Sequence, residues 1–341
     1  MVTGSIHSIS VDSITYEADT DARITIDDNY IYLVGLGAAR DGALFRIPLD
    51  GGKPEKIAVS KYGGGRLDAL RPLVSGNWII FGDTPYTNDN PSKWMIRAVN
   101  LKDLSERVII DEENDTAGLV KSFNFAAEGD NLYWDVLVPQ PDQQYIDTIS
   151  TMNLDTGKTV ILTSTKVNGW TWSLFGVSKG RLVVEQDGDQ NQGGGTNIFL
   201  FDPAGGQPQA LSTNGASDMP VFVYPWAAWK SGLRYQWTKD IQIYNLQTSQ
   251  TRSITLPGLD DTDPHMDGMR IYWSGYTDDT FSYFAIYIFD LIKNAIYIYP
   301  GTEKQELFTD IAIHGGVIAW IRWVSPSTGL PNPYLEWTTI N

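Results

Sequence analysis

The feature of this chain that most constrains its fold is a pattern of short β runs that recurs about every 45 to 52 residues. Each copy contains a run that ends in an aromatic residue, an alternating apolar run followed by a tight turn, and two further short runs. The aromatic ends fall at Phe81, Trp134, Trp273 and Trp320, and more loosely at Trp229. Four antiparallel strands in each repeat are typical of propeller blades.

The repeat predicts an all-β fold, namely one seven-bladed β-propeller domain over residues 1–341, with four-stranded antiparallel blades. The strands of a blade are named A to D from the axis outward. The expected A strands start near residues 22, 70, 122, 172, 219, 264 and 309. A two-sheet arrangement or a six-bladed ring remains an alternative.

The last copy of the repeat lacks its strand D, whereas the N-terminal segment 1–20 contains a spare β run, SITYE at 13–17. We expect this N-terminal strand to complete the last blade. Such a closure would cover an otherwise open strand edge, which is a site of unwanted pairing.

The turns between strands A and B keep a glycine, as in VSGN (74–77), AEGD (127–130), VSKG (177–180) and HMDG (265–268). The glycine supplies the positive φ that a tight turn needs. The repeat resembles that of TolB-like and dipeptidyl-peptidase-type propellers within the WD40-like group. The Ser-Pro-Asp before that glycine in TolB repeats is absent here. The resemblance implies the fold, and fold alone does not imply function.

The composition limits which kinds of molecule the chain is expected to bind. The formal net charge is −16, which disfavours nucleic acid and anionic membrane surfaces. No apolar run reaches the roughly 18 residues of a membrane span, so we expect no membrane insertion. The chain has no cysteine, which excludes disulfides and thiolate metal sites. We expect a bacterial, extracytoplasmic monomer that binds a protein or a glycan.

Loop length separates two faces of the expected propeller. The A–B and C–D turns are short, whereas the B–C and D–A connections are long, as in 83–93, 138–147 and 186–197. Binding sites concentrate on long loops carried by a rigid scaffold, so we expect the long-loop face to be the functional one. Drift of unselected surface loops is the alternative.

The ligand-binding candidates lie mainly on the D–A connections, which would ring the mouth of the channel. Aromatic rings, carboxylates and arginines there suit sugars or charged groups, although packing and ion pairs between blades explain the same residues. These candidates are Tyr62, Arg66, Asp68, Arg71, Lys121, Trp170, Trp172, Asp218, Asp263, His265 and Trp323.

One loop resembles part of a calcium site. Asp187, Asp189 and Asn191 place oxygen ligands at alternate positions, as in the first half of a calcium loop. The glycine is displaced and the closing Glu is missing, so a metal-free hairpin loop is the alternative. We expect no other cofactor.

Catalysis has little support in the sequence. It has three histidines, His7, His265 and His314, and no G-x-S-x-G elbow. The first hypothesis is therefore a non-catalytic binding propeller. The alternative is a carbohydrate-active hydrolase or lyase that uses carboxylates at the channel mouth. A purely structural domain of a larger surface protein is a third possibility.

Overall fold

The computed structural model describes fifteen segments of the chain, and all strands below lie within them. These segments are 5–11, 23–36, 42–62, 72–84, 94–111, 124–139, 145–167, 171–188, 195–205, 207–232, 240–254, 264–276, 284–300, 307–324 and 332–340. None of the described residues forms a helix long and apolar enough to cross a membrane.

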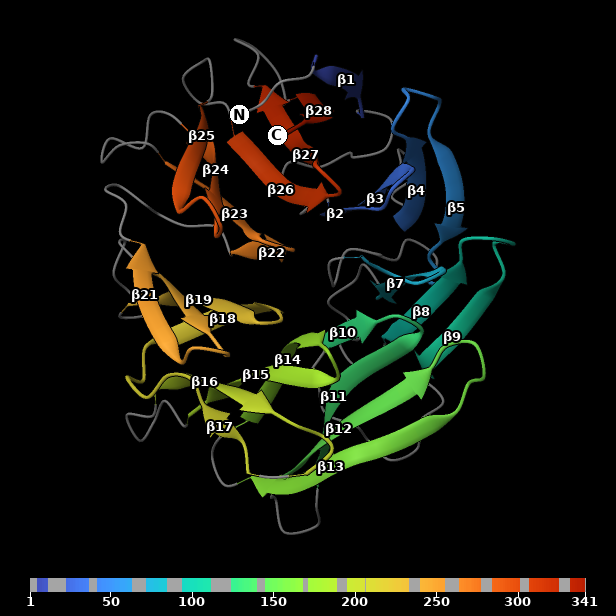
Figure 1. Ribbon diagram of the computed structural model, residues 1–341. Coiled ribbons are helices and arrows are strands. Elements are labelled where there is room, and N and C mark those ends of the chain that lie inside the picture. The colour runs from blue at the N-terminus through green and yellow to red at the C-terminus, as the bar shows by residue number, and fades with distance from the viewer. Residues whose placement is uncertain are drawn as a thin grey trace. The chain divides into compact units, whose positions relative to one another are not determined.

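The described strands form seven four-stranded sheets, and the fold is a seven-bladed β-propeller with antiparallel blades (Figure 1). Met1–Asn114 and Tyr272–Asn341 form one compact unit, and Asp115–Ile271 form a second. The expectation of a single domain over 1–341 stays a prediction.

The first unit contains three complete sheets. They are, in spatial order, β2 to β5 (Arg23–Ile26, Tyr30–Leu36, Gly42–Pro48, Glu55–Val59), β6 to β9 (Leu73–Ser75, Trp78–Asp83, Met95–Asn100, Glu106–Asp111), and β26, β27, β28 and β1 (Leu307–His314, Val317–Val324, Asn332–Thr339, His7–Ser10).

The second unit also contains three complete sheets, and one more sheet has strands in both units. The three are β10 to β13 (Phe125–Glu128, Asn131–Pro139, Tyr145–Asn153, Thr159–Val167), β14 to β17 (Thr171–Ser178, Arg181–Asp187, Thr196–Phe201, Gln209–Ala210) and β18 to β21 (Ser217–Val223, Trp226–Ser231, Asp240–Asn245, Gln250–Ile254). The remaining sheet is β22 to β25 (His265–Asp267, Arg270–Tyr276, Phe284–Asp290, Ala295–Pro300).

The seven-bladed prediction is confirmed. The first strands of the sheets, β2, β6, β10, β14, β18, β22 and β26, begin within three residues of the positions expected from the repeat. The repeat locates these strands because each sheet needs its own alternating apolar runs.

An N-terminal strand completes the last blade, as predicted, but it is β1 rather than the expected run at 13–17, which lies outside the described residues. β1 pairs antiparallel with β28 in the register His7↔Trp337 and Ile9↔Leu335 (Figure 1). The ring of His7 stacks on that of Trp337 at 5.2 Å, and Ile9 packs against the core of the sheet. The HSIS segment can act as the closing strand because its one apolar side chain, Ile9, points into the core.

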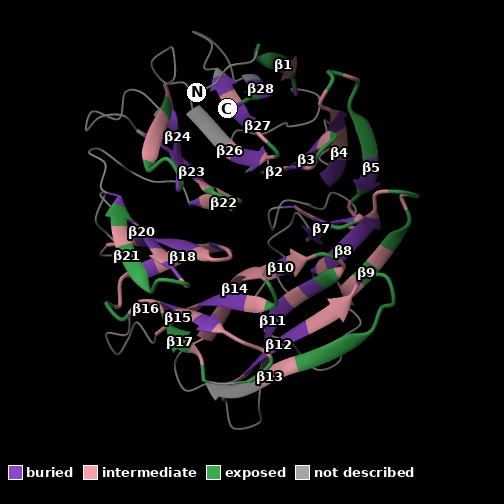
Figure 2. Cartoon of the chain, in the orientation of Figure 1, coloured by how far each residue is buried: buried purple, intermediate pink, exposed green. Residues whose placement is uncertain are grey.

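The apolar core lies between neighbouring sheets within each unit (Figure 2). The recurring aromatic at the second strand is buried in each case, with exposed fractions of 0% for Phe81, 7% for Trp134, 2% for Trp229, 1% for Trp273 and 0% for Trp320. These rings pack the sheets, as expected of a residue that recurs in each blade. The outer strands, such as β5 and β9, carry the exposed residues.

Candidate functional site: a pocket between the third and fourth sheets

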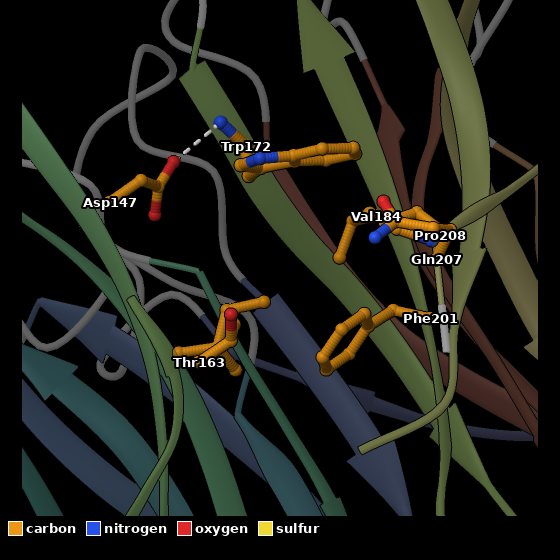
Figure 3. A pocket seen from close by; sticks show the side chains of 8 residues that line it. Asp147, Thr163, Trp172, Val184, Phe201, Gln207 and Pro208 are labelled. Carbon is orange, nitrogen blue, oxygen red and sulfur yellow. Dashed lines mark hydrogen bonds between the residues drawn. The ribbon is translucent and has the colours of Figure 1, made fainter. Parts of the chain in front are cut away.

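The third and fourth sheets, β10 to β13 and β14 to β17, enclose a pocket of about 180 Å³ (Figure 3). Both sheets belong to the second unit. We call it the Asp147 pocket, and its lining residues are Asp147, Ile149, Thr163, Trp172, Val184, Phe201, Gln207 and Pro208.

The local sequence explains how these side chains reach the pocket. In β12, Asp147 and Ile149 are two residues apart and therefore point to the same side of the strand. Ile149 packs against Leu174 and Val184 of the next sheet, in the core cluster that also holds Ala126. Asp147 thus occupies a strand position that faces the core, and such positions usually hold an apolar residue.

The carboxyl group of Asp147 is buried, with 2% of the residue exposed. Its Oδ2 accepts a hydrogen bond from the backbone N–H of Trp172 at 2.6 Å (Figure 3). Its Oδ1 is also buried and accepts no hydrogen bond from any residue that the structure describes. One half of the carboxyl group is therefore paired and the other half is available to a donor.

Burial raises the pKa of Asp147 to about 7, because desolvation of the carboxylate outweighs the opposing hydrogen bond from Trp172. The group therefore changes its charge near neutral pH. A carboxyl group with this property in a pocket is a candidate functional group.

Five of the other seven lining residues have apolar side chains, although polar atoms make up more of the surface open to the pocket than apolar atoms do. Trp172 and Phe201 contribute aromatic rings, and Ile149, Val184 and Pro208 contribute aliphatic surface. The Trp172 ring is itself fixed by an edge-to-face contact with Phe199 at 5.1 Å. A few polar groups among apolar walls are typical of a small-ligand site.

Polar residues complete the lining. Thr163 contributes a hydroxyl group and Gln207 an amide, and Gln207 is exposed. Gln207 therefore marks a side on which the pocket meets solvent.

Other carboxylates hold these two sheets together without lining the pocket. Asp135 accepts a hydrogen bond from the backbone N–H of Leu174 at 3.3 Å. Glu128 accepts bonds from the backbone N–H groups of Lys179 and Gly180 at 2.5 and 2.9 Å. Asp135 is 1% exposed and, like Asp147, binds the backbone of β14, which makes it the natural control for Asp147.

A second group of buried charges lies in the first unit. Arg97 Nη1 contacts Asp83 Oδ2 at 2.7 Å, and its Nη2 contacts Glu106 Oε2 at 2.6 Å. Asp83 also accepts hydrogen bonds from the Ser60 hydroxyl and the Lys61 backbone N–H. These bonds join two sheets and pair the charges internally, although Arg97 Nε is buried without a hydrogen-bond partner among the described residues, and this pairing indicates a structural role.

Five of the eleven ligand-binding candidates lie within the described residues. Trp172 lines the Asp147 pocket. Asp218 and His265 occupy the second position of β18 and the first position of β22. Trp323 is 8% exposed and belongs to the core cluster around β1 and β28, and Tyr62 follows Ser60 at the end of the first sheet.

The other six candidates, Arg66, Asp68, Arg71, Lys121, Trp170 and Asp263, lie outside the described residues. Of the calcium candidates, Asp187 ends β15 and its Oδ1 accepts a bond from the Thr196 hydroxyl at 3.4 Å. Asp189 and Asn191 are outside the described residues. No group of three or more acidic or histidine residues that could hold a metal occurs in the described segments. The calcium site stays a prediction.

Asp147 was not among the residues predicted from the sequence, although its pattern is present in the chain. The segment 138–147 was expected to be a connection, but Asp147 is the third residue of β12 and stands two positions before Ile149, in the apolar phase of that strand. A carboxylate in the inward phase of an alternating strand indicates a paired or functional group.

No protein-family model and no curated protein matches the sequence. Solved structures do match. Oligogalacturonate lyase from Vibrio parahaemolyticus aligns with 98% of this chain and 97% of its own, at 11% identity and a TM-score of 0.63. The β-propeller domain of the Trilobed protease from Pyrococcus furiosus aligns over 93% of this chain and 94% of its own, at 10% identity and a TM-score of 0.59.

The acylaminoacyl peptidase of Pyrococcus horikoshii aligns with 93% of this chain at 12% identity and a TM-score of 0.60, and 50% of the peptidase is covered. The chain has a peptidase-type propeller fold. Identities this low establish the fold and leave the activity open. The resemblance to peptidase-type propeller repeats is therefore confirmed as a resemblance of fold.

Proposed function

We propose that this propeller is a non-catalytic binding module that recognises a protein or glycan partner on its B–C and D–A connections, with the Asp147 pocket as one contact position. The observation that supports it is the buried Asp147 Oδ1, which accepts no hydrogen bond from the described residues and belongs to a side chain that lines a pocket with two aromatic rings. An unmade hydrogen bond of a buried group costs about 1–3 kcal/mol, so a ligand donor placed there would be favoured.

The position of the pocket fits this role. Asp147 is the third residue of β12, after the connection 140–144, and Trp172 is the second residue of β14, after the connection 168–170. Both residues therefore stand near strand ends where connections join the rigid sheets, and such positions commonly carry binding residues. A bacterial, extracytoplasmic location is part of the proposal and is checked by fractionation of cells that express the native gene.

The test is a pair of screens, on peptide and glycan arrays, with the wild-type chain and the variants Trp172→Leu and Asp147→Asn. We expect a partner whose signal falls about tenfold in both variants. Trp226→Leu, which removes a half-buried ring elsewhere in the same unit, and Asp135→Asn are the matched controls. Partner signals that neither pocket variant changes would contradict the assignment of the site.

A carbohydrate-active lyase or hydrolase is the second candidate, and the raised pKa of Asp147 favours it. General acids and bases work best when their pKa lies near the operating pH. Oligogalacturonate is a suitable probe, because elimination from a uronate yields an unsaturated product that absorbs ultraviolet light. Turnover that disappears in Asp147→Asn but not in Asp135→Asn would replace the binding proposal by this one.

A further inference from the structure

We propose that the Asp147 pocket holds a cationic side chain, a lysine or an arginine, of a basic peptide partner. The inference rests on the proposed binding function and specifies the chemistry that the same pocket recognises. Its basis is the combination of an unpaired carboxylate oxygen, aromatic rings and an aliphatic wall in one small cavity (Figure 3).

The carboxylate oxygen supplies the charge partner. Asp147 Oδ1 is buried and accepts no hydrogen bond from any described residue, whereas Oδ2 accepts one from the Trp172 N–H. Lysine and arginine side chains carry only donors, so either can satisfy Oδ1 without bringing another acceptor into the pocket. A hydrogen bond between a cation and a carboxylate is about twice as strong as a neutral one.

The walls suit the rest of such a side chain. Trp172 and Phe201 are aromatic, and a cation within about 6 Å of a ring face is attracted by the π electrons. Ile149, Val184 and Pro208 offer aliphatic surface for the methylene stem, which lysine and arginine commonly bury while their charge remains paired.

Charge favours the cation over a neutral sugar. No lysine, arginine or histidine is among the described residues that line the pocket, so no internal cation competes for Asp147. The chain carries a formal net charge of −16, which raises the local concentration of basic partners. A sugar hydroxyl could donate a hydrogen bond to Oδ1, but a neutral sugar would not be attracted by the negative charge of the chain.

Among the described residues around Asp147, few other titratable groups occur. Asp135, on β11, is the described carboxylate that faces the same strand, β14. β14 has no titratable side chain, and Glu185 of β15 accepts a bond from Met219 on the next sheet instead. A cation in the pocket would therefore act mainly on the charge of Asp147.

The experiment uses the full chain labelled with ¹⁵N-tryptophan and follows the Trp172 indole by NMR at about pH 8. The probes are Nα-acetyl-lysinamide, its neutral analogue Nα-acetyl-norleucinamide, and methyl α-galactopyranoside as a neutral sugar. We expect a saturable shift with the lysine derivative, and binding of the two neutral probes at least about tenfold weaker. The Asp147→Asn chain should lose this preference, whereas Asp135→Asn should keep it.

A measurement on the wild-type chain makes the test independent of whether the variants fold. Calorimetric titration with the lysine derivative at about pH 6 should show release of a proton, because the cation favours the ionised carboxylate. The release should vanish at about pH 9.

The outcomes separate the two proposals. If the norleucine derivative or the sugar binds as tightly as the lysine derivative, or if none of the three binds, the cationic inference is overturned. In that case the array signals still decide the binding function, because they use whole partners. If both pocket variants leave the array signals unchanged, the proposed function itself fails.

Discussion

Single buried charges are paired differently in the two units of this protein. Asp147 has one unpaired oxygen and a pKa raised by burial, so its ionised form is disfavoured in the folded chain. Arg97 lies in an ion-pair network in which Asp83 and Glu106 compensate its charge. Burial alone therefore does not decide whether a charge stabilises the fold, because the partners of that charge decide it.

The raised pKa of Asp147 predicts a dependence of stability on pH. The pKa is about 7 in the folded chain and near its ordinary value of 3.8 in the unfolded chain, so between these values the folded state binds more protons. The free energy of unfolding should therefore fall as pH rises through this window, by up to about 1.4 kcal/mol for each pKa unit, and level off above about pH 7.

The substitution Asp147→Asn should abolish this dependence of the free energy of unfolding on pH. We expect the variant to be more stable than wild type at about pH 8 and similar at about pH 4, as measured by urea unfolding at both pH values. A variant that is less stable at about pH 8 would show that the ionised carboxylate supports the fold through Trp172.

For the Arg97 network we expect that removing a charge lowers the stability of the fold, unlike the removal of the Asp147 charge. Arg97→Met leaves Asp83, which is 0% exposed, without its cation, and we expect a loss of about 3–5 kcal/mol in urea unfolding. Adding Asp83→Asn to that variant should restore part of the stability because the unpaired charge is removed. Equal stability of the single and double variants would argue against a charge effect.

At the scale of elements, the sequence predicts strands better than it predicts sites. The period of the repeat and the aromatic ends, such as Trp134 and Trp320, locate the sheets because every blade must bury the same face. The connections carry no such repetition, and six of the eleven binding candidates fall on connections outside the described residues. Asp147 was missed because its inward phase in β12 does not by itself show burial, which depends on β14, a strand of another sheet.

Strand irregularities also escape a sequence pattern of period two. In β14 the register shifts between Leu174 and Gly176, and in β18 it shifts between Asp218 and Val221. Met219, within the second shift, has a positive φ of 52° and donates its N–H to Glu185 of the preceding sheet. The contact that accompanies this irregular strand is therefore made by a residue more than thirty positions away.

The pairing of β1 with β28 predicts the effect of a truncation at the N-terminus. Removing residues 1–11 deletes β1, which leaves one edge of β28 unpaired and removes the stacking of His7 on Trp337. We expect a lower melting temperature and concentration-dependent aggregation in light scattering. Removal of residues 1–4, which precede β1, should have little effect and is the control. A soluble chain of unchanged stability would contradict the closure.

At the scale of the whole molecule, 41 acidic residues against 25 basic ones give the net charge of −16. Mutual repulsion of like charges destabilises a compact state, and salt screens it over a Debye length of about 10 Å at 0.1 M. We expect the melting temperature to rise when sodium chloride is raised from about 0.01 M to about 0.3 M. A melting temperature that falls over this range would show that attractive surface pairs dominate.

The pairing of β1 with β28 has a consequence for biosynthesis. His7 and its partner Trp337 are separated by about 330 residues, so at about 5–20 residues per second a ribosome needs roughly 15 to 65 s between them. During that time β1 has emerged from the ribosome but its partner strand has not yet been made. Its sequence, HSIS, has a single large apolar side chain, which suits a segment that must wait in water without aggregating. The last sheet is therefore completed long after β1 is made, and a chaperone would have its main opportunity to act in that interval.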